Sequence, residues 1–250
     1  MVRQGMNIFY EQLRDRSKKR LALLVDPDGY DVKSLEELIE KINLYPPDLL
    51  LVGGSILFKP IEITITALKL GTKIPVFIFP GNIFQLSDRA DGILFLSLIS
   101  GRNPEFLIGN HVLAAPHLGR SGIEVIPTAY MLIGNGITTS VEYMSNTSPI
   151  PGDKPDIAVA TAMAGEMLGL KSLYLEAGSG ASHSVEPDII RAIRENISLP
   201  MMVGGGIRTA ETAMELFNAG ADMIVVGNAL EKDPGLIEAF CSVRDTYNHA

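Results

Sequence analysis

The feature that most constrains the fold of this chain is a succession of short apolar runs separated by longer segments with helical periodicity. Most of the runs are apolar throughout, as is typical of strands buried on both faces of a parallel sheet. Eight such runs in 250 residues predict one domain over residues 1–250, an α/β fold of the (β/α)8 TIM-barrel type. The predicted strands are residues 21–25, 48–52, 75–79, 92–96, 123–126, 172–175, 200–203 and 222–226.

Helix signals lie between these runs. Thr209 has the character of an N-cap and Gly220 that of a C-terminal stop, while Ser184 is expected to open a helix that buries Ile189 and Ile193. Only residues 81–90 separate the third strand from the fourth, which is too short for a full crossover helix. We therefore expect the third helix of the barrel to be weak or missing.

Composition and charge exclude several classes of protein. The formal charge of -8 argues against a surface for nucleic acid or anionic membranes, which would need clustered Lys and Arg. The single cysteine, Cys241, rules out an intrachain disulfide and is expected to be a small apolar residue on the last helix. The N-terminal residues do not resemble a signal peptide, and no segment approaches the roughly 18 apolar residues of a membrane span, so we expect a cytoplasmic protein.

Glycine-rich sequences follow the last two predicted strands. The seventh ends in VGGGIRT and the eighth in VVGNAL. Loops after these two strands and the N-terminus of a short helix form the usual phosphate site of a TIM barrel, and Gly205, Gly206, Gly227 and Asn228 suit such a site because glycine lets the backbone approach a ligand closely. The alternative is that these glycines only make tight turns.

The sixth predicted strand ends in YLEAGSG, which places a glutamate at the end of a buried run. Gly178, Ser179 and Gly180 could extend the phosphate site with backbone N–H and hydroxyl donors. Glu176 would then lie beside the phosphate and act as a general base, or it would only pair with a Lys or Arg at the barrel rim. Tyr174 has the same two possibilities, ligand contact or core packing.

The first two predicted strands end in oxygen-bearing residues. VDPDGY places Asp26 and Asp28 after the first strand, and VGGS places Ser55 after the second. Carboxylate and hydroxyl oxygens suit Mg²⁺, which bridges readily to a diphosphate. P-D-G is also a common turn, and Ser55 could be only a helix cap. The four histidines show no ligand spacing, and only His183, in the loop after the sixth strand, merits attention.

These motifs together resemble geranylgeranylglyceryl phosphate synthase, a prenyltransferase of ether-lipid synthesis, in the larger of the family's two groups. VDPDG, LLLVGGS, IPTAY, YLEAGSG, VGGGI and VVGNAL occur in this order over residues 7–247, and YLEAGSG with DPD and VGGS is specific. The resemblance implies that Mg²⁺ binds Asp26 and Ser55. It implies that sn-glycerol 1-phosphate binds Tyr174, Leu175, Glu176, Ala177, Gly178, Ser179, Gly180, Gly205, Gly206, Gly227 and Asn228.

The resemblance also implies a reaction and an assembly. A prenyl diphosphate would meet the metal, with its tail in an apolar groove across the top of the barrel, and its prenyl group would be joined to the C3 hydroxyl of the glycerol. The family forms dimers or hexamers, so we expect a homo-oligomer. The chain departs from the family pattern at Leu24, where some members have lysine, and at Gly29, where a basic residue often follows DPD.

Two other reactions suit the fold but fit the residues of this chain less well. A triose-phosphate-type isomerase would need a lysine at the first strand and a histidine at the fourth, where this chain has Asp26 and Ser97. An aminoaldose-type isomerase would need an acid after the fifth strand, which is expected to end in Pro127 and Thr128. A barrel that only binds a phosphorylated metabolite is the remaining alternative, because a fold does not establish a function.

Overall fold

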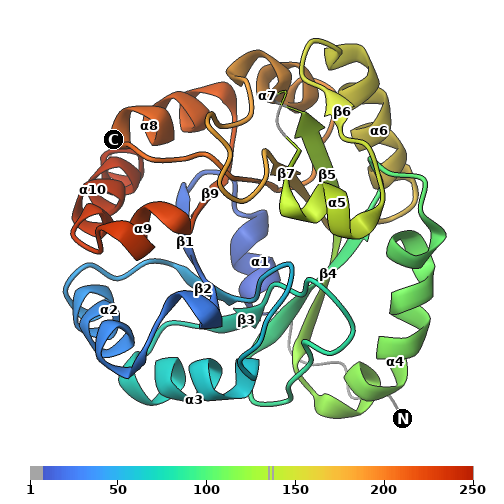
Figure 1. The fold of residues 1–250 in the computed structure, drawn as a ribbon. Coiled ribbons are helices and arrows are strands. Elements are labelled where there is room, and N and C mark those ends of the chain that lie inside the picture. The colour runs from blue at the N-terminus through green and yellow to red at the C-terminus, as the bar shows by residue number, and fades with distance from the viewer. Residues whose placement is uncertain (1–7, 135, 137, 250) are drawn as a thin grey trace.

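A computed structural model describes residues 8–134, 136 and 138–249. In this part of the chain, eight parallel strands close into a barrel in the order β4-β3-β2-β1-β9-β8-β7-β5, because β4 also pairs with β5 (Figure 1). A two-residue strand, β6 (Ile150–Pro151), extends the end of β5. The TIM-barrel prediction is confirmed. The barrel strands are β1 (Arg20–Val25), β2 (Leu49–Val52), β3 (Val76–Ile78), β4 (Gly92–Leu98), β5 (Glu124–Gly134), β7 (Ser172–Glu176), β8 (Met201–Gly204) and β9 (Met223–Val226).

Helices form a ring around the strands (Figure 1). Residues 79–91, which join β3 to β4 and are all described, contain no helix, so the expectation of a missing third helix is confirmed. The long helices of the ring are α2 (Val32–Leu44), α3 (Ile61–Gly71), α4 (Asn110–Ser121), α6 (Pro155–Met167), α7 (Pro187–Arg194), α8 (Ala210–Ala219) and α10 (Leu236–Asn248). Shorter helical segments are η1 (Pro27–Gly29), η2 (Glu105–Gly109), α5 (Ser140–Ser145) and α9 (Asn228–Lys232).

The helix caps follow the sequence signals in one case and depart from them in another. Thr209 caps α8 by accepting the N–H of Thr212, and Gly220 ends this helix in the left-handed conformation, as expected. The expectation that α7 begins after Ser184 is wrong. The helix begins at Pro187, because proline has its φ fixed near the helical value and needs no N–H partner in the first turn.

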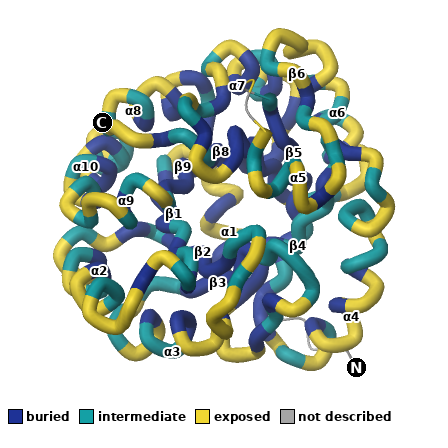
Figure 2. Tube along the Cα trace, in the orientation of Figure 1, coloured by how far each residue is buried: buried dark blue, intermediate teal, exposed yellow. Residues whose placement is uncertain are grey.

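Buried residues form two layers, one between the strands and the helices and one inside the barrel (Figure 2). Helix α1 (Ile8–Arg14) closes the amino end of the barrel, where the ring of Phe9 lies 5.2 Å from that of Phe77. The carboxylate of Glu124 accepts the N–H groups of Phe9 and Tyr10, at 3.0 and 2.7 Å, and so satisfies free donors at the start of α1. Cys241 is buried on α10, as expected.

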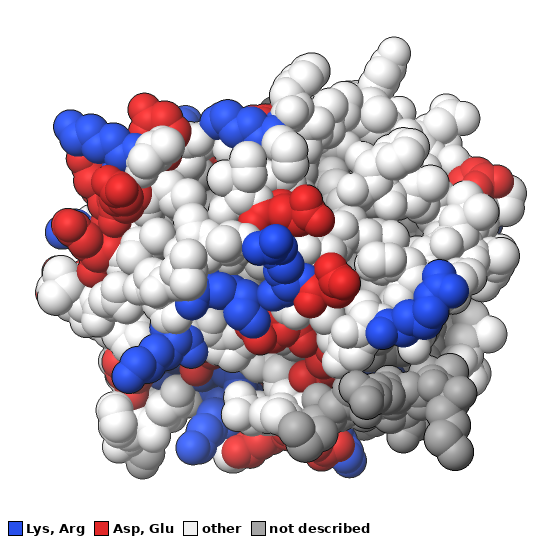
Figure 3. Space-filling view, turned by 90° about the horizontal axis from the view of Figure 1, so that it is seen from below, with Lys and Arg blue, Asp and Glu red and all other residues white. Residues whose placement is uncertain are grey.

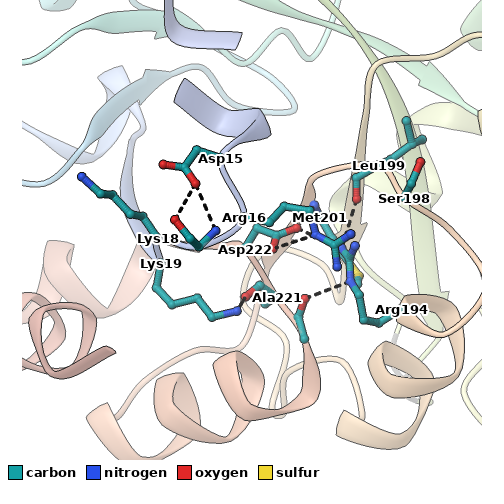
Figure 4. Close-up of polar contacts among 12 residues, drawn as sticks. Asp15, Arg16, Lys18, Lys19, Arg194, Ser198, Leu199, Met201, Ala221 and Asp222 are labelled. Carbon is teal, nitrogen blue, oxygen red and sulfur yellow. Dashed lines mark hydrogen bonds and ion pairs between the residues drawn. The ribbon is translucent and has the colours of Figure 1, made fainter. Parts of the chain in front are cut away.

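A polar cluster ties the start of β9 to the start of β8 (Figure 4). The carboxylate of Asp222 accepts the backbone N–H of Met201 at 2.8 Å and a guanidinium N–H of Arg194 at 2.9 Å. Arg194 also donates to the carbonyls of Gly220 and Leu199. This cluster belongs to the amino ends of the strands, the face of a TIM barrel that serves stability and not chemistry.

Charged side chains on the face shown in Figure 3 carry both signs. Basic and acidic groups lie interspersed over its left and central parts, and the upper right part has few charged residues. Among the described residues drawn on this face, charges of the two signs are therefore mixed. Within the residues described, no helix is both long enough and apolar enough to cross a membrane.

Candidate functional site

A cavity of about 680 Å³ opens at the carboxyl ends of the strands and brings together most of the residues singled out by the sequence. Leu175, Ala177 and Gly178 are not among its lining residues, and the side chain of Leu175 is buried in the layer between strands and helices. The predicted residues that do line the cavity are Asp26, Ser55, Tyr174, Glu176, Ser179, Gly180, Gly205, Gly206, Gly227 and Asn228.

Glu176 is the last residue of β7 and is only 5% exposed. Burial raises the pKa of its carboxyl group to about 7, and the N–H of Gly178 with the hydroxyls of Tyr174 and Tyr130 holds this pKa below what burial alone would give. The Gly178 N–H lies 2.7 Å from Oε1. Within the described residues, no Lys or Arg nitrogen lies within 4.0 Å of this carboxylate, so the structure does not show the ion pair that the alternative reading requires.

Tyr130 is a site residue that was not predicted from the sequence. The expectation that the fifth strand ends near Pro127 and Thr128 is wrong, because β5 continues to Gly134. Pro127 fits inside the strand since its carbonyl still accepts the N–H of Lys171 at 2.8 Å. The longer strand places Tyr130 beside Tyr174 in the ladder. The apolar run AYMLIG that follows Thr128 was the signal available for this extension.

Three aromatic rings pack together inside the barrel at this level. The ring centroids of Phe79, Tyr130 and Tyr174 are 5.1 to 5.9 Å apart, and all three residues line the cavity. Tyr174 therefore belongs to the core and to the cavity wall at once, so its two predicted roles do not exclude each other.

The glycine-rich ends of β8 and β9 fit closely against the loop after β7. Gly205 has a φ of 82°, and a Cβ atom at this position would collide with Oε1 of Glu176 and lie 2.8 Å from the nitrogen of Gly178. The hydroxyl of Ser179 donates to the side-chain oxygen of Asn228 at 3.2 Å. The three loops thus form one connected wall of the cavity.

Asp26 and Asp28 have different roles, although they are two residues apart. Oδ1 of Asp26 accepts the N–H of Asp28 at 2.9 Å, which is the turn contact, while Oδ2 faces the loop after β2, 2.7 Å from where a Cβ on Gly54 would lie. Both carboxylate oxygens of Asp28 accept backbone N–H groups, from Phe58 at 2.8 Å and Lys59 at 2.9 Å. Asp28 therefore fixes the loop that carries Ser55, and Asp26 is the carboxylate that faces the cavity.

Further residues contribute to the site or its support through contacts that no local pattern in the sequence predicts. The buried amide of Gln85 accepts the N–H of Gly81 at 3.0 Å and donates to the carbonyl of Gly54 at 2.7 Å, which joins the loops after β2 and β3. Arg208 lines the cavity itself, whereas Gln85 lies behind its wall. Among the histidines it is His111 that lines the cavity, where its Nε2 lies 3.1 Å from Oγ of Ser97, and His183 is not a lining residue.

The oxygen donors that follow β1 and β2 are of the kind that Mg²⁺ uses. Within the described residues, no three His, Cys, Asp or Glu side chains gather as a metal cluster. Mg²⁺ does not need one, because it commonly uses one or two carboxylates and takes its other ligands from phosphates and water. Asp26 and Ser55 line the same cavity and carry oxygen donors of the required kind.

The fold and the site define a TIM-barrel protein with an acidic, glycine-framed cavity at the carboxyl ends of its strands. Residues 14–244 match the PcrB family. A geranylgeranylglyceryl phosphate synthase of Spirosoma linguale is 47% identical over 93% of this chain and 94% of its own length, and one of Korarchaeum cryptofilum is 41% identical over 94% and 96%. This chain belongs to the PcrB/geranylgeranylglyceryl phosphate synthase family.

A solved structure agrees with this assignment. The (S)-3-O-geranylgeranylglyceryl phosphate synthase of Thermoplasma acidophilum, in complex with sn-glycerol-1-phosphate, is 32% identical to this chain and superposes with a TM-score of 0.88. The match covers 96% of this chain and 98% of the Thermoplasma chain, so the two proteins share the whole barrel.

Proposed function

We propose that this protein is a geranylgeranylglyceryl phosphate synthase, which joins the prenyl group of an isoprenoid diphosphate to the C3 hydroxyl of sn-glycerol 1-phosphate and releases diphosphate. The observation that carries the proposal is Glu176, a buried carboxylate without a cationic partner among the described residues, framed by the glycine-rich loops of a family member. The substrate held by the Thermoplasma relative supports the choice of acceptor.

We assign the acceptor to the wall formed by the loops after β7, β8 and β9. Backbone N–H groups at glycines and the Ser179 hydroxyl are suitable donors for its phosphate. Tyr174, Leu175, Ala177 and Gly178 would shape the floor and back of this wall. The phosphate would contact residues Ser179, Gly180, Gly205, Gly206, Gly227 and Asn228.

Glu176 is proposed to accept the proton of the C3 hydroxyl as its oxygen bonds to the prenyl carbon and the bond from that carbon to the diphosphate breaks. A carboxylate with a pKa of about 7 suits this task, because near neutral pH it is substantially ionised and still holds a proton well. Asp26 and Ser55 would hold Mg²⁺, which, when bound, would offset the charge that builds up on the leaving diphosphate. The prenyl tail would lie against the apolar lining residues Phe95, Ala114, Val141 and Met144.

The test is the transfer of label from radioactive sn-glycerol 1-phosphate into an organic-extractable product in the presence of Mg²⁺ and donors of 15, 20 and 35 carbons. We expect product with at least one donor, and the preferred length follows from comparing the three. Absence of product with all three donors from a folded protein would overturn the proposal.

The general base is tested with Glu176→Gln, which keeps the size of the side chain but cannot take the proton. We expect kcat to fall by on the order of 10² to 10⁴ while glycerol phosphate still binds. Glu195→Gln, at an exposed position, is the matched control and should leave kcat unchanged. A kcat for Glu176→Gln within about threefold of the parent, at saturating substrates and with release shown not to limit, would end this assignment.

The assembly and the location expected from the sequence remain predictions. A homo-oligomer, a dimer or a hexamer, is expected for a member of this family, and light scattering would decide between these sizes and a monomer. The expected cytoplasmic location can be checked by fractionation of cells that express the protein.

A further inference from the structure

Glu231 is an acidic residue of the cavity that has no role in the predictions from the sequence or in the proposed mechanism. It lies in α9, the short helix that follows the glycine-rich end of β9, and it lines the same cavity as Asp26 and Ser55. Strand β9 pairs with β1, so the segments that follow these two strands are neighbours. Glu231 and Asp26 therefore approach the cavity from adjoining strand ends.

The carboxyl group of Glu231 lies over the turn that follows Asp26. A Cβ atom on Gly29 would be 3.2 Å from the carboxyl carbon of Glu231 and 3.3 Å from its Oε1. Gly29 donates its own N–H to the carbonyl of Asp26 at 3.0 Å, so the turn beneath the Glu231 carboxylate is the one that begins at Asp26. Glycine at position 29 leaves the room in which the Glu231 carboxylate lies, and a larger side chain would displace it.

Hydrogen bonds connect Glu231 to the wall formed by the loops after β7, β8 and β9, which is called the phosphate wall below. Its Oε2 accepts from the side-chain nitrogen of Asn228 at 3.4 Å, and the side-chain oxygen of Asn228 accepts from Ser179 at 3.2 Å. The same carboxylate thus lies between the loops assigned to the acceptor and the turn that carries Asp26.

Among the described residues neither carboxylate is in an ion pair, although Lys59 lies near Asp26 and Lys232 near Glu231. Within the described residues, no Lys or Arg nitrogen lies within 4.0 Å of Asp26 or Glu231. The ammonium group of Lys59, which is near Asp26, donates to the carbonyl of Tyr30 at 2.6 Å. Two partly buried carboxylates that line one cavity and have no ion-pair partner favour binding of a divalent ion.

We propose that Glu231 is a third protein ligand of the divalent-cation site, beside Asp26 and Ser55. The inference rests on the proposed function, which supplies the need for the cation. Two carboxylates and one hydroxyl leave coordination positions for diphosphate oxygens and water, as Mg²⁺ requires. Through Asn228, Glu231 also fixes the distance between the cation and the loops that hold the acceptor.

The experiment measures cation binding directly, with Mn²⁺ as the probe. Mn²⁺ is titrated into the folded protein, alone and with equimolar inorganic diphosphate, and free Mn²⁺ is followed by electron paramagnetic resonance. We expect Glu231→Gln and Asp26→Asn each to weaken Mn²⁺ binding about tenfold or more. Glu238→Gln removes the same charge from an exposed position on α10 and should leave binding unchanged. Thermal midpoints show that each variant is folded.

The Glu231→Gln variant distinguishes a metal ligand from a residue that only orients Asn228. Its side-chain oxygen can still accept the Asn228 hydrogen bond, so Glu231→Gln should leave the Kd for glycerol phosphate within about twofold of the parent if Glu231 is a metal ligand. Mn²⁺ binding within twofold of the parent in Glu231→Gln, or a parent protein that binds no Mn²⁺ with or without diphosphate, would overturn the inference.

Failure of this inference can be distinguished from failure of the proposed function. A parent protein that makes the prenylated product, with Mn²⁺ binding that depends on Asp26 and not on Glu231, refutes only the role of Glu231. A parent protein that binds Mn²⁺ through both carboxylates but makes no product with any donor refutes the proposed function and leaves the cation site in place.

Discussion

The carboxylate of Glu176 occupies the space that a side chain at Gly205 would fill. Residue 205 has a φ of 82°, a conformation that glycine adopts easily, and its missing Cβ is what lets Oε1 of Glu176 lie next to the backbone that follows β8. The glycine is therefore required by the proposed base itself, in addition to any close approach of a phosphate. The position of the base and the shape of the phosphate wall are fixed by the same contact.

Gly205→Ala is expected to displace Glu176 and so to slow the reaction. Displacement of a catalytic group by about 1 Å can cost on the order of 10²-fold, and we expect a fall in kcat of that size. The strained backbone and the collision should also lower the free energy of unfolding by about 1 to 3 kcal/mol. Steady-state kinetics and urea unfolding measure the two effects.

The matched control for this substitution is Gly119→Ala. A Cβ at Gly119, on α4, meets nothing within 4 Å. Alanine there should stabilise the protein by about 0.5 to 1 kcal/mol and leave kcat unchanged. A folded Gly205→Ala protein with the kcat of the parent would show that Glu176 does not need its present position.

Gln85 is expected to be essential for the arrangement of the loops after β2 and β3. Gln85→Met keeps the length of the side chain but leaves the carbonyl of Gly54 and the N–H of Gly81 without this partner. Each unsatisfied buried group costs about 1 to 3 kcal/mol, so we expect a loss of about 2 kcal/mol or more in urea unfolding. The Mg²⁺ concentration for half-maximal activity should rise, because the same loop carries Ser55.

Gln12→Met, at an exposed position on α1, controls for the change of side chain and should alter neither quantity. If the midpoint of urea unfolding is the same for Gln85→Met and for the parent, the amide does not hold these loops together.

The barrel could be predicted from the sequence because its strands are continuous apolar runs with glycine, serine or acidic residues at their carboxyl ends. These signals are local, and so Asp26, Ser55, Glu176 and Gly205 could be assigned to one cavity from a knowledge of the fold alone. The prediction that the fifth strand ends too early had a local cause as well. Proline usually interrupts a ladder, but Pro127 needs only its carbonyl for the contact with β7.

The remaining site residues depend on contacts between distant segments. Gln85 is polar and lies in a loop, and nothing in its neighbourhood indicates that its amide is buried against Gly54. Glu231 directly follows VVGNAL in the sequence, but only the fold places it over Gly29. The different roles of Asp26 and Asp28 also depend on which backbone N–H groups reach each carboxylate.

Asp222 is expected to be important for stability and unimportant for catalysis. Its side chain is 3% exposed and binds Arg194, whose own side chain is 13% exposed. Asp222→Ala would leave the guanidinium without its carboxylate, and breaking a buried pair in this way costs about 3 to 5 kcal/mol. The KM for glycerol phosphate should not change, because the pair lies at the amino ends of the strands, away from the cavity.

Glu11→Ala provides the contrast, since it breaks a pair with Arg14 in which the two side chains are 62% and 57% exposed. This loss should be about 0.5 kcal/mol or less. Chemical unfolding of both variants measures the difference, and equal effects would contradict the role given to burial.

The stability of the protein should depend on pH through Glu176. Burial raises the pKa of this carboxyl group from 4.5 to about 7 in the folded state. Between these two pH values the folded protein keeps a proton that the unfolded chain has released, so the contribution of Glu176 to stability falls as pH rises and levels off above about pH 7. A shift of this size corresponds to about 3 kcal/mol.

Glu176→Gln cannot ionise and therefore lacks this dependence. We expect the free energy of unfolding of the parent, relative to Glu176→Gln, to fall by about 3 kcal/mol between pH 4.5 and pH 8, with most of the change below pH 7. All other titrating groups are common to both proteins and cancel in the difference. The free energy of unfolding of Glu195→Gln, a change at an exposed position, should vary with pH as that of the parent does. Parallel curves for the parent and Glu176→Gln would mean that the carboxyl group of Glu176 titrates in the folded protein as it does in the unfolded chain, and a base with a pKa near neutrality would then have to be sought elsewhere in the cavity.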